Sequence, residues 1–330
     1  MRLGLFSIFA SMLILPGIAF AQFASGTGSA ASFTLSSEPQ YPAPYSPVTL
    51  TIFSDSLDLT RATMVVTVAG NEIYRGTVQP VTTTVGGTGK PVAVNVTIFL
   101  DGTSYSQVLS IQPQDVALVA EPISSEPPLY PGKPLVPIGG DVRIVAMADL
   151  RNAQGKEIDP TTYSYAWTVD GTRATNASGI GKDSMIVASP LQYRARTVSV
   201  VVISPDGTLV GGDSISLSPS EPSVEIYKND PLLGILYDHA LSGNYAITGA
   251  ESTLYAAPFS FPTTSGTPTL QWFLNGDNAQ AGDSITLRPT GSGQGSASLS
   301  LVASTGSYIT ATTNLSLSFG TAMNSNFFGL

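Results

Sequence analysis

The chain has 330 residues, a formal net charge of −9, no cysteine and one histidine, His239. The missing cysteines exclude disulfides, thiolate catalysis and thiolate metal sites, and the single histidine excludes any site that needs two imidazoles. The excess of acidic charge argues against nucleic acid and anionic membrane surfaces as partners.

Residues 1–21 have the pattern of a signal peptide. Arg2 supplies a positive start, residues 3–20 are apolar, and Ala19-Phe20-Ala21 fits a cleavage site. We predict cleavage and export to the cell surface, the extracellular space or the periplasm, with no transmembrane segment in the mature chain. An uncleaved membrane anchor is the alternative, because the stretch is just long enough to span a bilayer. Residues 22–32 are small and predict a flexible linker.

Two proline-containing stretches mark the starts of predicted modules. Ser37-Glu-Pro39-Gln-Tyr41 is echoed by Ser125-Glu-Pro127-Pro-Leu-Tyr130, and Pro219–Pro222 is a weaker version. Because proline removes a backbone donor, it suits edge strands and the ends of strands. We therefore place module starts near residues 33, 120 and 222.

Three stretches share a pattern that ends in glycine: Val66–Gly70, Trp167–Gly171 and Trp272–Gly276. In each, a large apolar residue and a second apolar residue alternate with other residues and lead into a tight turn. We therefore expect Trp167 and Trp272 to pack between two sheets and not to form a sugar-stacking platform. A further repeat, Asp183-Ser184 and Asp283-Ser284, follows in the last two. Repetition in the same order indicates tandem modules, and their many short strands indicate β-sandwiches.

The fold class predicted is all-β, with three tandem Ig-like or PKD-like β-sandwiches and one short helical insert in the third. We refer to the sandwiches as modules 1, 2 and 3. Their expected bounds are 33–119, 120–221 and 222–320, followed by a C-terminal tail at 321–330.

Module 2 resembles PKD-type and related Ig-like domains. The resemblance rests on Tyr165–Gly171, Leu191–Tyr193 and Thr197–Gly207, which match a strand with a central Trp and a later Tyr followed by a Val-rich strand. It covers module 3 partly and module 1 only in pattern, and the acidic cluster after the Trp is reduced to Asp170-Gly171. The whole chain is also similar to secreted multi-Ig proteins of bacteria. The resemblance implies a surface or envelope protein used for spacing, adhesion or assembly, and a corner role for Tyr193.

Residues 230–243 predict the helical insert. Asp230 can cap it, Pro231 can be its first residue, and Gly243 can end it. It is either a docking element or a cover for a sheet edge or module junction. The candidate docking residues are Leu232, Leu233, Leu236, Tyr237 and His239 here, with Phe327 and Phe328 in the tail.

No catalytic, cofactor-binding or metal-binding residue is assigned. His239 beside Asp238 offers one imidazole and one carboxylate, too few for a metal site. Carboxylates near the junctions leave interdomain Ca²⁺ open as the one cofactor considered, although no calcium-binding loop motif accompanies them. These carboxylates are Glu121 and Glu126 at the first junction, and Glu221, Glu225 and Asp230 at the second.

The predicted function is that of a non-enzymatic, exported spacer, adhesion or assembly protein whose partner is a protein or another envelope component. The alternative is a carbohydrate- or wall-binding protein, which needs exposed aromatic residues gathered on one face. The candidates for such a face are Phe53, Phe99, Phe273 and Tyr308. A hydrolase would need a placed pair of acids, and no spacing singles one out. The oligomeric state is left open.

Overall fold

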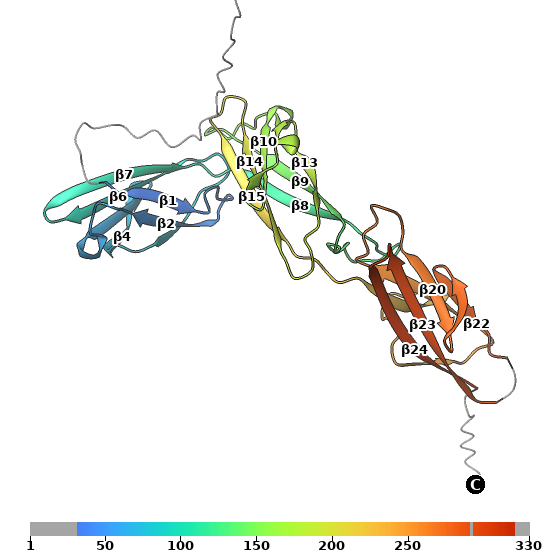
Figure 1. Ribbon diagram of the computed structural model, residues 1–330. Coiled ribbons are helices and arrows are strands. Elements are labelled where there is room, and N and C mark those ends of the chain that lie inside the picture. The colour runs from blue at the N-terminus through green and yellow to red at the C-terminus, as the bar shows by residue number, and fades with distance from the viewer. Residues whose placement is uncertain (1–31, 291–292, 321–330) are drawn as a thin grey trace, which may run out of the picture.

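The computed structural model describes residues 32–290 and 293–320. Within them the chain is all-β, with 24 strands in six sheets, and the only helical turns are three 3-10 turns of three residues each. The sheets pair into three sandwiches, and module 2 lies between modules 1 and 3 (Figure 1). No helix among the described residues is long and apolar enough to cross a membrane.

Module 1 packs a three-stranded sheet, ordered β1-β2-β5, on a four-stranded sheet, ordered β4-β3-β6-β7. The alternation read from the sequence sets the inward face: Val94, Val96 and Ile98 are fully buried, while Asn95 is exposed between them. The strands are β1 (Thr34–Glu38), β2 (Pro47–Phe53), β3 (Thr63–Val68), β4 (Asn71–Thr77), β5 (Val81–Thr84), β6 (Val92–Leu100) and β7 (Thr103–Ile111).

Module 2 repeats the plan. One sheet has the order β13-β9-β8, and the other has the order β11-β10-β14-β15, with β12 also paired to β10. The strands are β8 (Asp115–Ile123), β9 (Asp141–Asp149), β10 (Ser164–Val169), β11 (Thr172–Arg173), β12 (Gly179–Ile180), β13 (Ser184–Ala188), β14 (Arg196–Ile203) and β15 (Val210–Leu217).

The N-terminal part of module 3 contributes strands to both of its sheets. β16 joins the sheet β17-β16-β19-β22, and β18 pairs in parallel with β24 in the sheet β18-β24-β23-β20-β21. The strands are β16 (Ser223–Asp230), β17 (Gly234–Ile235), β18 (Asn244–Ile247), β19 (Ser252–Phe259), β20 (Thr269–Leu274), β21 (Asp277–Ala281), β22 (Ser284–Leu287), β23 (Gly295–Thr305) and β24 (Ile309–Phe319).

The repeated glycine belongs to the same tight turn in every module. Ala69–Gly70, Asp170–Gly171 and Asn275–Gly276 join β3 to β4, β10 to β11 and β20 to β21, and both residues of each pair have positive φ. Two positive φ values define the type I′ turn, whose twist matches that of paired strands. The turn explains why the glycine recurs while the residue before it varies.

Both tryptophans lie between the sheets, as expected. Trp167 and Trp272 have no exposed surface. Their indole Nε1 atoms donate to the carbonyl oxygens of Lys182 at 2.8 Å and Gly282 at 3.0 Å. Val66 takes the position in module 1 and is equally buried, so burial is required there but the indole hydrogen bond is not.

The repeated Asp-Ser pair stands where the chain enters a strand of the sheet opposite the one that holds the tryptophan. The carbonyl oxygens of Asp183 and Asp283 accept hydrogen bonds from the backbone N–H of Ala146 at 2.8 Å and of Ala256 at 2.7 Å. Each aspartate therefore follows the residue that binds the indole and begins the pairing between adjacent strands. These repeated residues build the fold.

The predicted helix at 230–243 is wrong. Asp230 Oδ1 does accept from the backbone N–H of Leu232 at 3.0 Å and of Leu233 at 3.2 Å, as a capping residue would. The turn then reverses at Gly234, whose φ is +76°, and β17 pairs back onto β16. The segment forms a hairpin and loop, so the fold is all-β throughout the described residues.

Tertiary packing explains this correction. The outer face of the β16-β19 sheet presents Tyr227 and Tyr255, and Ile235, Tyr237 and Ala240 of the segment pack on them. An extended segment covers this flat aromatic face along its length. Local helix signals are weak compared with such packing.

The predicted module bounds stay a prediction. The expected division between residues 119 and 120 falls inside β8, which pairs with β9 along its whole length. The other division, between 221 and 222, precedes β16. Residues 1–21, most of the 22–32 linker and the 321–330 tail lie outside the described residues.

Candidate functional site

The repeated Ser-Glu-Pro stretches connect one module to the next. β1 ends at Glu38 and β8 ends at Ile123, so both stretches follow a first strand that has crossed its own sandwich. The two ends of such a strand therefore lie at opposite ends of the sandwich. Each stretch therefore faces the following module, whereas the sequence suggested module starts.

At the first junction, Tyr41 of module 1 reaches module 2. Its ring lies over Gly212 of β15, so close that a Cβ there would come within 2.8 Å of it. Burial raises the pKa of the Tyr41 hydroxyl. Buried Gln114 also exchanges two hydrogen bonds with the Arg151 backbone, at 2.7 and 3.0 Å.

At the second junction, module 2 adds backbone pairing to module 3. Ser124 forms a β-bridge with Pro262. Ser125 donates its backbone N–H to the Phe261 carbonyl at 2.7 Å, and its hydroxyl accepts the Phe261 N–H at 3.1 Å. Ser125 is 8% exposed, so this connector is an integral part of the interface.

A second buried serine hydroxyl makes hydrogen bonds across the same junction. Ser260 is 1% exposed and donates to the carbonyl oxygen of Ser220 at 3.1 Å, with that of Val136 at 3.4 Å. Ser220 in turn donates its N–H to Val136 at 2.8 Å. Three separate chain segments therefore meet at this point.

Four aromatic rings extend the second junction. Tyr130 of the connector packs edge-on against Phe259 and Tyr237, with ring centroids 5.0 and 5.6 Å away, and Tyr237 does the same to Tyr227 at 5.2 Å. The Tyr237 hydroxyl donates to the Pro128 carbonyl at 2.9 Å. Burial, with smaller effects of neighbouring tyrosines, raises the pKa of Tyr237 to about 12.

The 230–243 segment thus splits the predicted docking residues into two groups. Leu232 and Leu233 stand at the tip of the β16-β17 hairpin, 94% and 76% exposed. Tyr237 points into the junction, and half-buried Leu236 donates its N–H to the Lys228 carbonyl at 2.9 Å. Of these four residues, only the two leucines of the tip are available to a partner.

His239, the remaining docking candidate of the segment, is exposed, and its Nδ1 lies 2.9 Å from the Asp238 carboxylate. That carboxylate has its pKa lowered chiefly by this hydrogen bond. Phe327 and Phe328 lie outside the described residues.

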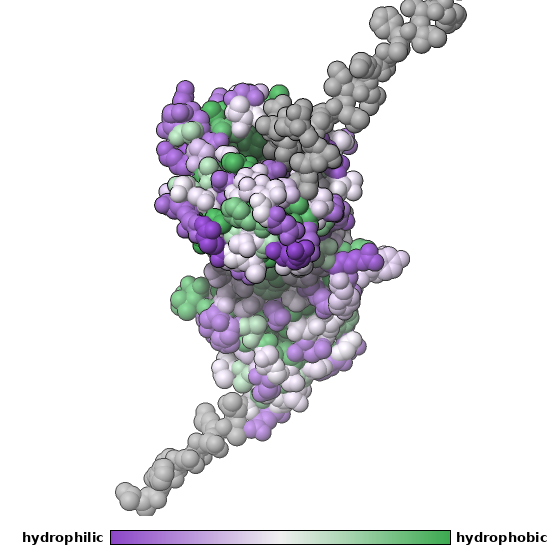
Figure 2. All heavy atoms as spheres, turned by 90° about the vertical axis from the view of Figure 1, so that its left-hand side faces the viewer, coloured by the Kyte–Doolittle hydropathy of each residue, from purple (hydrophilic) through white to green (hydrophobic). Residues whose placement is uncertain are grey.

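The proposed sugar-stacking residues do not share a face. Phe53 ends β2 and Phe99 lies in β6, which belong to the two opposed sheets of module 1. Phe273 is half-buried in β20, and Tyr308 stands alone in the β23-β24 turn. On the face shown in Figure 2, hydrophobic residues are scattered among hydrophilic ones.

Tyr193 is not a corner tyrosine. It is 89% exposed with a positive φ. Buried Tyr163 does the equivalent bonding: its hydroxyl donates to the Ile158 carbonyl at 2.7 Å and accepts the Leu150 N–H at 3.1 Å. The sequence pattern selected the wrong tyrosine because a turn projects Tyr193 into solvent.

The junction carboxylates considered for Ca²⁺ point to different partners. Glu121 pairs with Arg143 at 2.9 Å, Glu221 accepts from Gln192 at 2.7 Å, and burial raises the pKa of Glu225. Among residues 32–290 and 293–320, no group of three or more His, Asp or Glu side chains could hold a metal.

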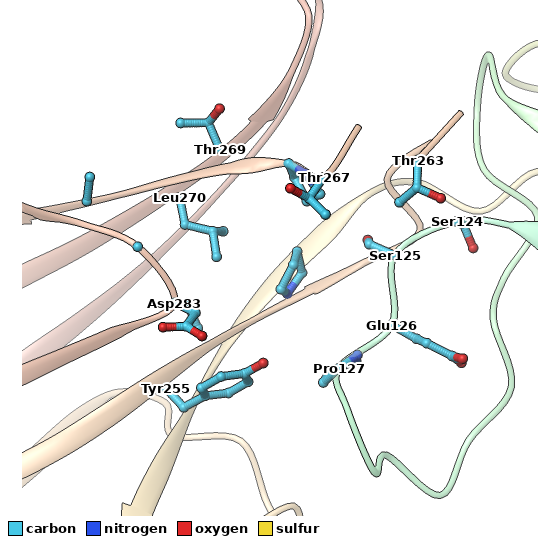
Figure 3. Close-up of a pocket in the computed structure, with 15 residues that line it drawn as sticks. Ser124, Ser125, Glu126, Pro127, Tyr255, Thr263, Thr267, Thr269, Leu270 and Asp283 are labelled. Carbon is cyan, nitrogen blue, oxygen red and sulfur yellow. The ribbon is translucent and has the colours of Figure 1, made fainter. Parts of the chain in front are cut away.

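A cavity of about 650 Å³ opens at the second junction (Figure 3). The connector supplies Ser124 to Pro127, and module 3 supplies the opposite wall, including Tyr255, Leu270 and Asp283. Glu126, expected at the first junction, lies here. Sequence reasoning missed the cavity, although the Ser-Glu-Pro echo marked one side of it.

No family model and no curated protein matches the chain. Three N-terminal domains of the Hoc capsid protein of bacteriophage RB49 are 13% identical, cover 88% of this chain and 99% of their own, and give a TM-score of 0.24. The central fibronectin-III array of RIM-binding protein is 9% identical, covers 90% and 100%, and gives a TM-score of 0.30.

The fibronectin(III)-like modules of Clostridium thermocellum CbhA are 11% identical, cover 60% of this chain and 94% of their own, and give a TM-score of 0.24. These TM-scores are too low to compare function or module arrangement. The chain is a tandem array of Ig-like β-sandwiches. Its own strand order, repeated three times, carries that conclusion.

Proposed function

We propose that the chain is an exported, non-enzymatic spacer that presents a protein-binding surface at a set distance. The observation that supports it is the connector used twice, since Tyr41 and Tyr130 each pack on the following module. Tandem modules with bonded connectors keep their separation better than modules on free linkers. The exposed Leu232-Leu233 tip is the first contact we assign to a protein partner.

The spacer role is tested by distance measurements on spin-labelled cysteines, which the chain lacks naturally. Val108, Ile186 and Thr310 are exposed, one in each module. Labels placed there in pairs should give narrow distance distributions. Tyr41→Ala should broaden the two distributions that span the first junction, Val108–Ile186 and Val108–Thr310, and leave Ile186–Thr310 narrow. Broad distributions in the unaltered chain would contradict a spacer.

Partner binding is tested by placing a photo-crosslinking residue at Leu232 and exposing the chain to envelope fractions of its source cells. Tyr308 is the matched control, since it is 95% exposed on another turn of module 3. We expect a discrete protein adduct from Leu232 and none from Tyr308. Its loss in Leu233→Ser would support the tip; an adduct consisting only of polysaccharide would contradict a protein partner.

A further inference from the structure

The cavity at the second junction has apolar walls. Pro127 of the connector and Leu270 of module 3 line it from its two sides (Figure 3). Pro258 and Pro268 of module 3 line it as well. A volume of about 650 Å³ is within the range of small-ligand sites. An alkyl chain entering here would bury its surface against these four side chains.

Tyr255 brings an unpaired polar group to this cavity. The residue is 8% exposed, and its hydroxyl has no hydrogen-bond partner among the described residues. Figure 3 shows the hydroxyl directed toward the space between the connector and module 3. The hydroxyl oxygen is accessible from the cavity rather than sealed inside the protein, so a ligand's polar atom can take the place of water there.

The charged residues around the cavity favour a cationic ligand. Asp283 and Glu126 line the cavity, and no Lys, Arg or His does. Burial, followed by the charge of Asp283, raises the pKa of Tyr255, which therefore stays neutral beside the carboxylate. With a chain charge of −9 as well, a cation is attracted here.

We propose that this cavity binds a lysine or arginine side chain of a protein partner. The alkyl stem packs on Pro127, Pro268 and Leu270, and the charged end meets Asp283 and the Tyr255 hydroxyl. Long basic side chains combine these two properties. A saccharide fits less well, because the face of Tyr255 is too buried for a sugar to stack on it. The inference rests on the proposed function only in taking a protein as partner, and it uses a surface separate from the Leu232-Leu233 tip.

The test titrates the mature chain with Nα-acetyl-lysine amide and Nα-acetyl-arginine amide, followed by NMR. Nα-acetyl-norleucine amide, which keeps the stem without the charge, is the control ligand. We expect the basic probes alone to shift signals of Tyr255, Leu270 and Asp283, with an affinity that falls as salt rises.

Asp283→Asn should weaken binding of the basic probes at least about threefold, the scale of one partly exposed charge pair. Asp183→Asn is the matched control, because Asp183 has the same backbone role in module 2 and lies outside the cavity. Thr267→Lys places a resident ammonium at the exposed rim and should abolish binding even if Asp283→Asn disturbs folding.

Equal shifts from the norleucine probe, or unchanged binding in both cavity variants, would overturn the proposal. So would shifts produced by maltose and not by the basic probes. The crosslinking result at Leu232 is independent of this outcome, so failure of the cavity and failure of the proposed protein-binding function are distinguishable.

Discussion

The two junctions begin with the same kind of connector and end with different interfaces. At the first, Tyr41 packs over Gly212, and Gln114 bonds to Arg151. At the second, the connector also forms a β-bridge, encloses two serine hydroxyls and joins an aromatic cluster. The added part comes from module 3, whose 230–243 segment has no counterpart in module 2.

This difference indicates where the chain specialises. A similar connector packs on the following module at both junctions, and a non-repeated segment reinforces the second junction and exposes a hairpin tip beside it. The cavity with Tyr255 also belongs to the second junction. The repeated features therefore build the fold, and the two proposed contact sites both lie at or beside the second junction.

The largest expected effect comes from removing the buried indole of Trp272 from the core of module 3, beyond the second junction. Trp272→Ala should destabilise that module by about 3–5 kcal/mol, because a fully buried indole is lost and a cavity is left. Denaturant unfolding followed by hydrogen exchange should show modules 1 and 2 still protected. Simultaneous loss of protection in module 1 would show that the junctions are coupled.

A smaller loss is expected when a buried hydroxyl is removed from the second junction. Ser260→Ala leaves the carbonyl of Ser220 without this donor and should cost about 1–3 kcal/mol. Exposed Ser110 in β7 supplies the control, since its hydroxyl makes no hydrogen bond among the described residues and Ser110→Ala should change thermal stability little. Equal effects of the two changes would mean that the buried Ser260 hydroxyl contributes no more to stability than an exposed one.

Alkaline pH should weaken the second junction further. Tyr237 has its pKa raised to about 12 from 10.0, so its stabilising contribution is complete below pH 10. As the pH rises from 10 to 12, the unfolded chain loses the proton first and that contribution falls. Tyr237→Phe should cost about 1 kcal/mol at pH 7 through the lost bond to Pro128.

Chemical denaturation between pH 10 and 12 measures how much Tyr237 contributes to the alkaline loss of stability. The Tyr237→Phe chain should lose less stability than the unaltered chain between pH 10 and 12. Parallel pH profiles would place the alkaline sensitivity elsewhere.

The smallest effect is a gain confined to module 1, away from both junctions. Ala69 has φ +50° in the β3-β4 turn, where Asn275 occupies the matching position in module 3. Ala69→Asn should raise stability by about 0.5 kcal/mol, because asparagine tolerates this conformation better. Thermal unfolding should show the gain, and the Val108–Ile186 distance should stay unchanged.

Local patterns in the sequence were enough to predict the three sandwiches, their tight turns and the buried positions of Trp167 and Trp272. Alternation and positive-φ turns depend on neighbours in the chain, so they can be read from local patterns. The sequence named Leu232 and Leu233 as docking candidates on a helix, but it did not predict that they would be exposed at the tip of a hairpin.

The conformation of 230–243 and the positions of the connectors depend on tertiary packing. A capping aspartate and a proline predict a helix locally, but the aromatic face of Tyr227 and Tyr255, formed by distant strands, is covered by an extended segment. A strand that crosses its sandwich likewise carries Glu126 to the far pole. Such outcomes depend on contacts between residues far apart in the chain, which local sequence patterns do not encode.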